Sequence, residues 1–194
     1  MEQLAKAYAE RKHDSVGHRR KYTGEPYIAH PAAVVELVRS VPHTEAMLCA
    51  AWLHDTVEDT PATLDDIRAV FGDEVAVLVE MLTDVSRPED GVRAERRAAD
   101  RKHSAKASPQ AKTIKLADVI DNAGSIASKD PEFAKVYLAE NALLLEVLKE
   151  GDPVLLRAAD EAIKKGMSSL DAHRQTRPWM GSINDVNQEK RSGE

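Results

Sequence analysis

Apolar side chains recur along this chain at intervals of three and four residues, whereas β-branched runs bounded by turns are scarce. This is the period of an α-helix that turns one face toward a core. Residues 44–53 are apolar on nearly every helical face, which predicts a buried helix at the centre of the domain. With 194 residues, 42% of them hydrophobic, the chain can bury one sizeable core but hardly two. We therefore predict an all-α fold, a single-domain helical bundle.

The apolar spacing, the prolines at helix starts and a glycine stop after Phe71 define the expected helices. They cover Glu2–Arg11, Pro31–Arg39, Thr44–Leu53, Thr63–Phe71, Asp73–Leu82, Pro109–Ala127, Pro131–Leu148 and Pro153–Leu170.

Two segments depart from this pattern. Residues 86–108 carry many charged and few apolar side chains, so we expect either an exposed helix or a mobile loop there. From Arg174 onward the chain is polar and rich in helix breakers. We therefore expect a folded domain over residues 1–173 and a flexible polar C-terminal tail over residues 174–194.

Composition narrows the functional classes. A net charge of −6 and 4% aromatic residues provide neither a broad basic face nor a stacking platform, so long nucleic acid is not expected as a partner. The single cysteine, Cys49, lies in an apolar run and predicts an inert buried thiol. The N-terminus lacks an apolar core of signal-peptide length, and no window approaches the roughly 18 apolar residues of a membrane span. We therefore expect a soluble cytoplasmic protein with no membrane association.

Four residues have the side-chain chemistry of a metal site. His54 and Asp55 are neighbours at the end of the central apolar run, His30 comes earlier, and Asp118 follows a later apolar stretch. Two imidazoles and two carboxylates suit Mn²⁺, Fe²⁺ or Zn²⁺ better than Ca²⁺, and such a set leaves coordination positions open for water and phosphate. A lone His-Asp pair is usually structural, but open positions on a four-residue set are typical of catalysis. The set predicts a metal-dependent hydrolase.

Four linked motifs then resemble the hydrolase domain of the RelA/SpoT family, whose compact free-standing form is the small alarmone hydrolase, a branch of the HD superfamily. They are the stretches Arg20–Pro31 (RKYTGEPYIAHP), Leu53–Thr60 (LHDTVEDT), Leu82–Asp84 (LTD) and Ser108–Asp118 (SPQAKTIKLAD) with Asn122. The match runs from about Leu4 to Ala127 in the same order and spacing as in the family.

This resemblance implies a helical HD fold that holds one Mn²⁺ ion per chain through His30, His54, Asp55 and Asp118. It also implies a 3′-pyrophosphohydrolase, which removes pyrophosphate from the 3′ position of a guanosine alarmone and returns GDP or GTP. Glu58 and Asp59 match the acid pair that follows the metal motif in the family, one turn beyond His54-Asp55, where they could orient or deprotonate the attacking water.

The substrate contacts that the resemblance implies are cationic or polar. Arg20 and Lys21 match a basic pair that grips the base or sugar, and a guanidinium can stack on a purine face. Asn122 lies one helical turn after Asp118, on the same face. The remaining expected substrate contacts are Arg96, Arg97 and Tyr137. No second catalytic region is visible in the chain. We expect the protein to act on a small nucleotide and to be a monomer or homodimer.

Departures from the family keep other functions open. The segment Val119–Gly124 replaces a pattern that in many relatives carries an aromatic residue or histidine before Asn122, so the pocket wall is altered. Purine discrimination depends on a few hydrogen bonds to the base edge, so either (p)ppGpp or (p)ppApp fits this sequence. One alternative is an HD-type phosphohydrolase that acts on another nucleotide or a phosphorylated cofactor. A second is a non-catalytic alarmone sensor. The retained acid pair argues against it, because binding alone needs no water-activating carboxylate beside the metal.

Overall fold

The computed structural model describes residues 1–175 and contains no strand within that range. An isolated antiparallel bridge joins Arg19 to Pro26 in the loop that follows the first helix. The all-α prediction is confirmed. The helices are α1 (Glu2–Ser15), α2 (Ala29–Arg39), α3 (Glu45–Leu53), α4 (Thr56–Asp59), α5 (Leu64–Phe71), α6 (Asp73–Leu82), α7 (Arg93–Ser104), α8 (Pro109–Lys129), α9 (Pro131–Leu145) and α10 (Pro153–Gln175).

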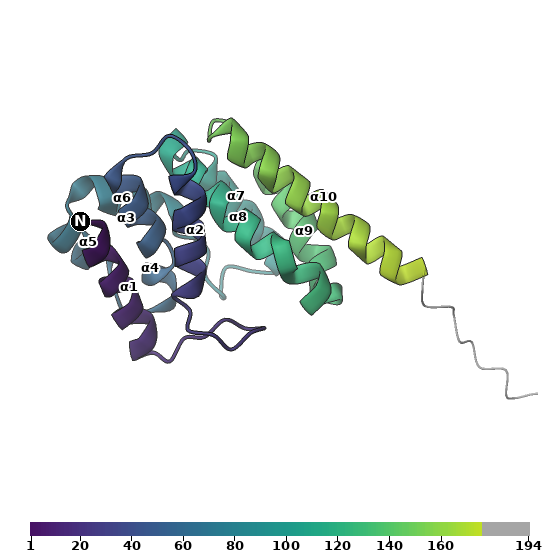
Figure 1. The fold of residues 1–194 in the computed structure, drawn as a ribbon, viewed down its shortest axis with the longest axis horizontal. Coiled ribbons are helices and arrows are strands. Elements are labelled where there is room, and N and C mark those ends of the chain that lie inside the picture. The colour runs from purple at the N-terminus through teal and green to yellow at the C-terminus, as the bar shows by residue number, and fades with distance from the viewer. Residues whose placement is uncertain (176–194) are drawn as a thin grey trace, which may run out of the picture.

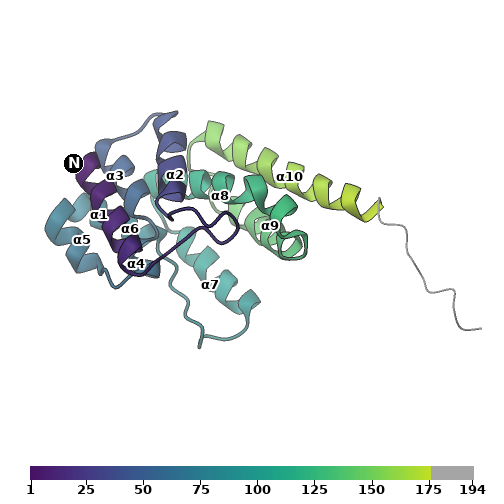
Figure 2. The same cartoon turned by 60° about the horizontal axis from the view of Figure 1, so that its bottom comes forward.

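Two groups of helices meet along α2, α3 and α8. Figures 1 and 2 show α1, α3, α5 and α6 on one side and α8, α9 and α10 on the other, with α2 between them. Every residue from Met47 to Leu53 in α3 is buried, as expected for a central helix. The long helix α10 packs along α8 and α9, while α7 stands away from the body in Figure 2 and contacts only α6 and α9 closely.

The helix starts follow the local capping chemistry. The Thr63 side chain and Asp66 form a reciprocal capping box at α5, and Gly72 ends that helix with a φ of +86°. Ser108 accepts a hydrogen bond from the Ala111 amide at the start of α8, and the Asp152 carboxylate accepts from the first-turn amides of α10. These starts agree with the sequence prediction.

Several boundaries differ from the prediction. Helix α1 continues four residues past Arg11, and α2 begins at Ala29, so Pro31 lies third in its first turn, where a missing N–H leaves no helical hydrogen bond unmade. Helix α9 ends at Leu145 rather than Leu148. The charged segment 86–108 divides into irregular chain and the exposed helix α7. Helix α10 includes residues 174 and 175, and the rest of the predicted tail lies outside the described residues.

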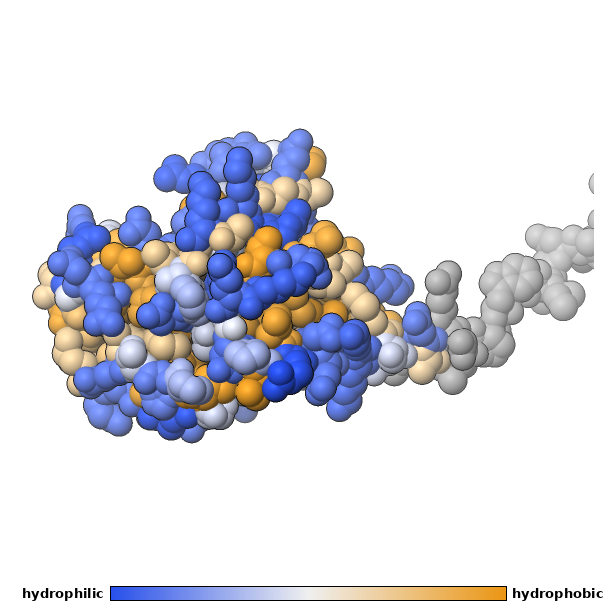
Figure 3. All heavy atoms as spheres, turned by 90° about the horizontal axis from the view of Figure 1, so that it is seen from above, coloured by the Kyte–Doolittle hydropathy of each residue, from blue (hydrophilic) through white to orange (hydrophobic). Residues whose placement is uncertain are grey.

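The length and apolar character of a helix decide whether it could span a membrane. Within residues 1–175 we find no helix that combines the length and the apolar character needed to cross a bilayer. On the face shown in Figure 3, hydrophilic side chains predominate and apolar ones are visible between them.

A close approach between the α9–α10 loop and α8 secures the second group of helices. A Cβ atom added at Gly151 would lie 2.8 Å from Leu116 Cδ1 and 3.1 Å from the backbone of both Lys112 and Thr113. The Lys112 side chain is buried there and forms an ion pair with Glu150, while Thr113 Oγ1 accepts a hydrogen bond from the Asp152 amide. A side chain at position 151 would therefore force the loop and α8 to move apart.

We expect Gly151→Ala to lower the free energy of unfolding by about 1–3 kcal/mol, because the backbone atoms that it meets cannot move aside without shifting α8. Gly124→Ala is the matched control: it lies in α8, and nothing lies within 4 Å of its added Cβ. The control should raise stability by up to about 1 kcal/mol through helix propensity. Urea unfolding of both variants measures the difference, and equal stabilities would contradict the close approach.

Candidate metal centre and nucleotide pocket

Four residues from three helical regions converge at the junction of the two helix groups. His30 lies in the first turn of α2, and Asp118 lies in the middle of α8. His54 and Asp55 occupy the break between α3 and α4, where one caps the end of the first helix and the other precedes the second. Neighbours inside a straight helix diverge by about 100°, so this break is what lets both side chains face the same point.

The donor atoms of these residues lie at the separations that ligands of one metal ion adopt. The Nε2 atoms of His30 and His54 are 3.3 Å apart, and His54 Nε2 is 3.1 Å from Asp55 Oδ2. His30 Nε2 lies 3.1 Å from Asp118 Oδ1 and 3.5 Å from Asp55 Oδ2. One donor atom from each of His30, His54 and Asp55 lies within 4.8 Å of the others. Asp118 Oδ1 borders this group, 3.1 Å from His30 Nε2 and 3.8 Å from His54 Nε2. The structure thus brings together the four predicted ligands, a set that could hold a divalent metal ion.

Outer contacts fix the orientation of each side chain in this set. The other ring nitrogen of His30 lies 2.6 Å from Asp121 Oδ2, and that of His54 lies 2.8 Å from the Ala51 carbonyl oxygen. Because each Nδ1 can keep its proton for its partner, a metal ion that displaces the Nε2 protons can bind both Nε2 atoms. The Tyr27 hydroxyl donates to Asp55 Oδ2 at 2.5 Å. Metal-binding histidines usually have such partners, so the donor set fits a metal ion chemically.

Opposite charges stabilise the ionised carboxylates despite their burial. Burial raises the pKa of Asp118, but the Lys115 ammonium and the hydrogen bond with His30 outweigh it and hold the pKa well below its usual range. Burial likewise opposes ionisation of Asp55, whose pKa is lowered by the charge of His54 and their hydrogen bond. Lys115 Nζ lies 3.2 Å from Asp118 Oδ2, and nearby carboxylates raise its pKa against the effect of burial. Both aspartates are therefore anionic at neutral pH.

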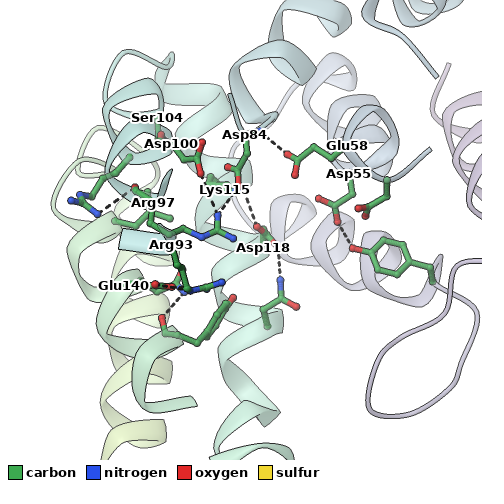
Figure 4. Close-up of a pocket in the computed structure, with 17 residues that line it drawn as sticks. Asp55, Glu58, Asp84, Arg93, Arg97, Asp100, Ser104, Lys115, Asp118 and Glu140 are labelled. Atoms are coloured by element: carbon green, nitrogen blue, oxygen red, sulfur yellow. Dashed lines mark hydrogen bonds and ion pairs between the residues drawn. The ribbon is translucent and has the colours of Figure 1, made fainter. Parts of the chain in front are cut away.

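A cavity of about 250 Å³ opens beside this cluster. Figure 4 shows Asp55 and Glu58 facing Asp84, Lys115 and Asp118 across it. Seven carboxylates and four cationic side chains line the cavity, so the protein alone gives it a negative balance. A phosphate-containing ligand would meet repulsion there unless a cation were also bound.

The predicted acid pair lies in this cavity. Glu58 Oε1 accepts a hydrogen bond from the Asp84 amide at 2.7 Å. The cavity walls raise the pKa of Glu58 to about 7 by removing the side chain from water; Lys115 lowers it, and the charges of Asp84 and Asp55 raise it further. Burial and Asp55 also raise the pKa of Asp59. A carboxylate with a pKa near 7 has the proton affinity of a general base at neutral pH.

A second cavity, of about 270 Å³, adjoins the first, and both are lined by Tyr27, Asn122 and Tyr137. Arg20 and Lys21 line only the second one. The Arg20 guanidinium donates to Asp121 Oδ2 at 2.9 Å and to Asn122 Oδ1 at 3.2 Å.

Two of these side chains have contacts that the sequence did not indicate. Lys21 is 70% exposed at the rim, with its ammonium 3.4 Å from Asp130 Oδ2. Asn122 also donates to Asp118 Oδ1 at 2.7 Å, so it contacts both a predicted ligand and the second cavity.

The two arginines predicted from the charged segment differ in whether they reach the main cavity. Arg97 lines the metal-side cavity and pairs with Asp84 at 2.6 Å. Arg96 lines a smaller adjoining cavity of about 120 Å³ and does not border the main one. Arg97 also lines that smaller cavity, so α7 presents both arginines there but only Arg97 to the main cavity.

Sequence reasoning missed several residues that border the site. Tyr27 and Lys115 stand inside the recognised motifs, so their position could have indicated them. Asp121 was noted only as a departure from the family pattern, although it contacts both His30 and Arg20. Arg93 pairs with Glu140 through two hydrogen bonds of 2.8 and 2.7 Å, a contact between α7 and α9 that no local pattern reveals.

Comparison with known proteins places this arrangement in a family. The HD domain family matches residues 5–145. The chain belongs to the HD domain family. Among solved structures, this HD domain is similar to a metazoan ortholog of SpoT that hydrolyzes ppGpp and plays a role in starvation responses, with a TM-score of 0.75 and 30% identity over 84% of this chain and 94% of that one. A protein from Listeria monocytogenes EGD-e matches with a TM-score of 0.61 and 29% identity over 74% of this chain and 99% of that one.

Curated relatives of this HD domain carry RelA/SpoT-type names. A probable guanosine-3′,5′-bis(diphosphate) 3′-pyrophosphohydrolase from Synechocystis is 48% identical over 75 residues, which is 39% of this chain and 10% of the relative. A GTP pyrophosphokinase from Streptomyces coelicolor is 40% identical over 125 residues, 63% of this chain and 14% of the relative. The chain thus spans 10–14% of the length of these two relatives. The resemblance read from the sequence motifs is confirmed.

We expect Asp121→Asn to weaken Mn²⁺ binding about 10–100-fold, because the amide cannot hold the His30 Nδ1 proton as a carboxylate does. Asp118→Asn, which alters a proposed direct ligand, should weaken binding further. Isothermal titration of metal-free protein measures both, with circular dichroism to check that the helices are retained. Asp171→Asn on the exposed side of α10 is the matched control. Unchanged affinity in Asp121→Asn would mean that Asp121 does not orient His30.

Proposed function

We propose that this protein is a Mn²⁺-dependent 3′-pyrophosphohydrolase that converts the purine alarmones (p)ppGpp or (p)ppApp to GDP/GTP or ADP/ATP and pyrophosphate. The observation that carries the proposal is the adjacency of two cavities. One is lined by the acid pair and by Asp55 and Asp118, the two aspartates of the His/Asp cluster, and the other presents Arg20 and aromatic side chains. The likeness to a metazoan SpoT ortholog that hydrolyzes ppGpp supports it.

In this proposal His30, His54, Asp55 and Asp118 hold the Mn²⁺ ion. The ion, when bound, lowers the pKa of a coordinated water and polarises a phosphate oxygen. Asp121 and the Ala51 carbonyl keep the two imidazoles in the tautomer that such binding needs.

The chain's own residues handle the proton and the leaving group. Glu58 takes a proton from the attacking water as the water oxygen forms a bond to the phosphorus attached to the ribose O3′. The bond between that phosphorus and O3′ breaks, O3′ takes up a proton from solvent as it leaves, and the proton held by Glu58 returns to solvent. The hydrogen bond that Glu58 accepts from the Asp84 amide orients Glu58 for this role. Asp59 lines the same cavity and assists in placing the water.

Cationic side chains on the opposite wall bind the pyrophosphate. Lys115 lies beside Asp118, and Arg97 reaches the cavity from α7. Arg97 is paired with Asp84 at present, so it must exchange a carboxylate for a phosphate oxygen when substrate binds. Arg96 lines the smaller adjoining cavity and not the main one, so we propose that it contacts only the distal phosphates.

The second cavity is proposed to receive the purine. The planar Arg20 guanidinium, restrained by Asp121 and Asn122, can stack on the base. Tyr137 borders both cavities and is suited to contact the sugar, and Lys21 contributes charge at the rim.

One chain supplies every residue in this scheme, so we propose that the protein acts as a monomer or homodimer. We also propose that it works in the cytoplasm, since its one cysteine is a buried free thiol and purine nucleotides are its substrates. Residues 1–173 are the proposed hydrolase domain and residues 174–194 its tail.

Product analysis tests the reaction. The Mn²⁺-loaded protein is incubated in parallel with ppGpp, ppApp and a simple 3′-nucleotide, and nucleotide, pyrophosphate and orthophosphate are quantified. We expect pyrophosphate and GDP or ADP in equal amounts. Orthophosphate alone would indicate a different HD phosphohydrolase, and nucleotide binding without turnover would indicate a sensor. Either result overturns the proposal.

Glu58→Gln tests the acid pair. We expect turnover to fall by roughly two orders of magnitude while Mn²⁺ and nucleotide still bind, because the amide cannot accept the proton. Glu161→Gln on the exposed side of α10 is the matched control. In the wild type, turnover should rise as the pH rises through about 7, since Glu58 must lose its proton to act as a base. Undiminished turnover in the variant would place Glu58 outside the reaction.

A further inference from the structure

A second group of metal-binding side chains lies behind the proposed acid pair. His13 comes from the last turns of α1, His18 from the loop that follows it, and Asp59 from the end of α4. The Nδ1 atoms of the two histidines are 3.2 Å apart, and His18 Nδ1 lies 3.7 Å from Asp59 Oδ2. Three donor atoms, one from each residue, lie within 4.8 Å of one another.

The local fold holds this group in place. The His18 amide donates to the His13 carbonyl oxygen at 3.0 Å, and Gly17, with a φ of +65°, turns the chain between them. The His18 ring stacks on Tyr27, with ring centroids 3.7 Å apart and planes 13° apart. The His13 ring is buried, with its centroid 4.6 Å from that of Tyr27. Two rings fixed against the same tyrosine are preorganised for a common ligand.

The spacing matches that of the first cluster. There the two Nε2 atoms are 3.3 Å apart and the nitrogen-to-carboxylate distances run from 3.1 to 3.8 Å. Ligands bonded at about 2.0–2.1 Å to one tetrahedral ion lie about 3.3 Å apart. Both separations in the second group, 3.2 and 3.7 Å, fall close to this value.

A simple hydrogen bond between His13 and His18 explains only part of this geometry. It accounts for the approach of the two Nδ1 atoms, but not for the carboxylate beside them. A cation attracts both nitrogens and the carboxylate at once. The side chains of His18 and Asp59 are 28% and 37% exposed, which gives an ion access from solvent.

We propose that His13, His18 and Asp59 form a second metal site, separate from the His30 cluster, that binds Zn²⁺. Two imidazoles and one carboxylate are a common zinc donor set, with a water as the fourth ligand. This group has one carboxylate where the His30 cluster has two, and a donor set with fewer oxygen ligands favours Zn²⁺ over Mn²⁺.

Binding here would affect catalysis through Asp59, a consequence that rests on the proposed function. Asp59 also lines the metal-side cavity. When its carboxylate is bound to Zn²⁺, the metal neutralises its charge and restricts its orientation, so it places the attacking water less well. We therefore expect Zn²⁺ bound at this site to inhibit turnover.

Zinc stoichiometry tests the site independently of activity. Metal-free full-length protein is dialysed against a series of Zn²⁺ concentrations, and bound zinc is measured per chain. We expect two zinc ions per chain in the wild type and one in His18→Gln. His43→Gln, whose ring is held by the Val41 carbonyl oxygen away from the group, is the matched control and should bind two. Asp118→Asn should retain the zinc of the second site.

The outcomes separate the two proposals. One zinc per chain in the wild type, lost in Asp118→Asn, would overturn the second site and leave the first intact. Two zinc ions in a folded His18→Gln variant would overturn it as well. If zinc inhibits the wild type and His18→Gln equally, the effect on turnover is wrong even where the stoichiometry is right. A protein that lacks hydrolase activity but binds two zinc ions would contradict the proposed function alone.

Discussion

Two aspartates, Asp55 and Asp118, are held ionised at the junction of two helix groups, and the arrangement of the site depends on how their charge is balanced. Burial alone would protonate them. The protonatable imidazoles of His30 and His54 and the ammonium of Lys115 compensate, each within 3.8 Å of at least one carboxylate oxygen. The cavity beside them still carries more carboxylates than cations. A divalent ion is the simplest means by which such a cavity can accept a polyphosphate, and this is the physical reason to regard it as a metal centre.

Helix α8 couples this charge balance to the proposed nucleotide pocket. Lys115, Asp118 and Asn122 recur at helical spacing, so one face of α8 offers a cation, a carboxylate and an amide in sequence. Asp121 accepts from both His30 and Arg20, and thereby links an imidazole of the cluster to the guanidinium of the second cavity. If Arg20 moved onto a base, Asp121 would lose one of its two partners, so the proposed base contact and the proposed metal site share this carboxylate.

The sequence predicted the fold class, most helix boundaries and the four residues of the cluster, because helical periodicity, capping and the motif spacing are local or ordered along the chain. It did not predict how side chains outside those motifs are paired. Asp121 stood out only as a departure from the family pattern, since its partners His30 and Arg20 are 91 and 101 residues away. The positions of Arg96 and Arg97 depended on where α7 begins within a charged segment that has no apolar stripe to fix its rotation. Packing against α6 and α9, not local propensity, decides which arginine faces the cavity.

The segment between α1 and α2 contributes side chains to both cavities and to the His13 group. It supplies His18, Arg20 and Tyr27, and Tyr27 both stacks on His18 and donates to Asp55. The backbone pairing of Arg20 with Glu25 and the bridge from Arg19 to Pro26 make this loop a small hairpin with its own internal restraint. Because its side chains point into both cavities and toward the His13 group, the hairpin cannot shift for one ligand without displacing a contact made to another. The hairpin contacts therefore link the position of the His/Asp cluster to that of the proposed base pocket and of the second histidine group.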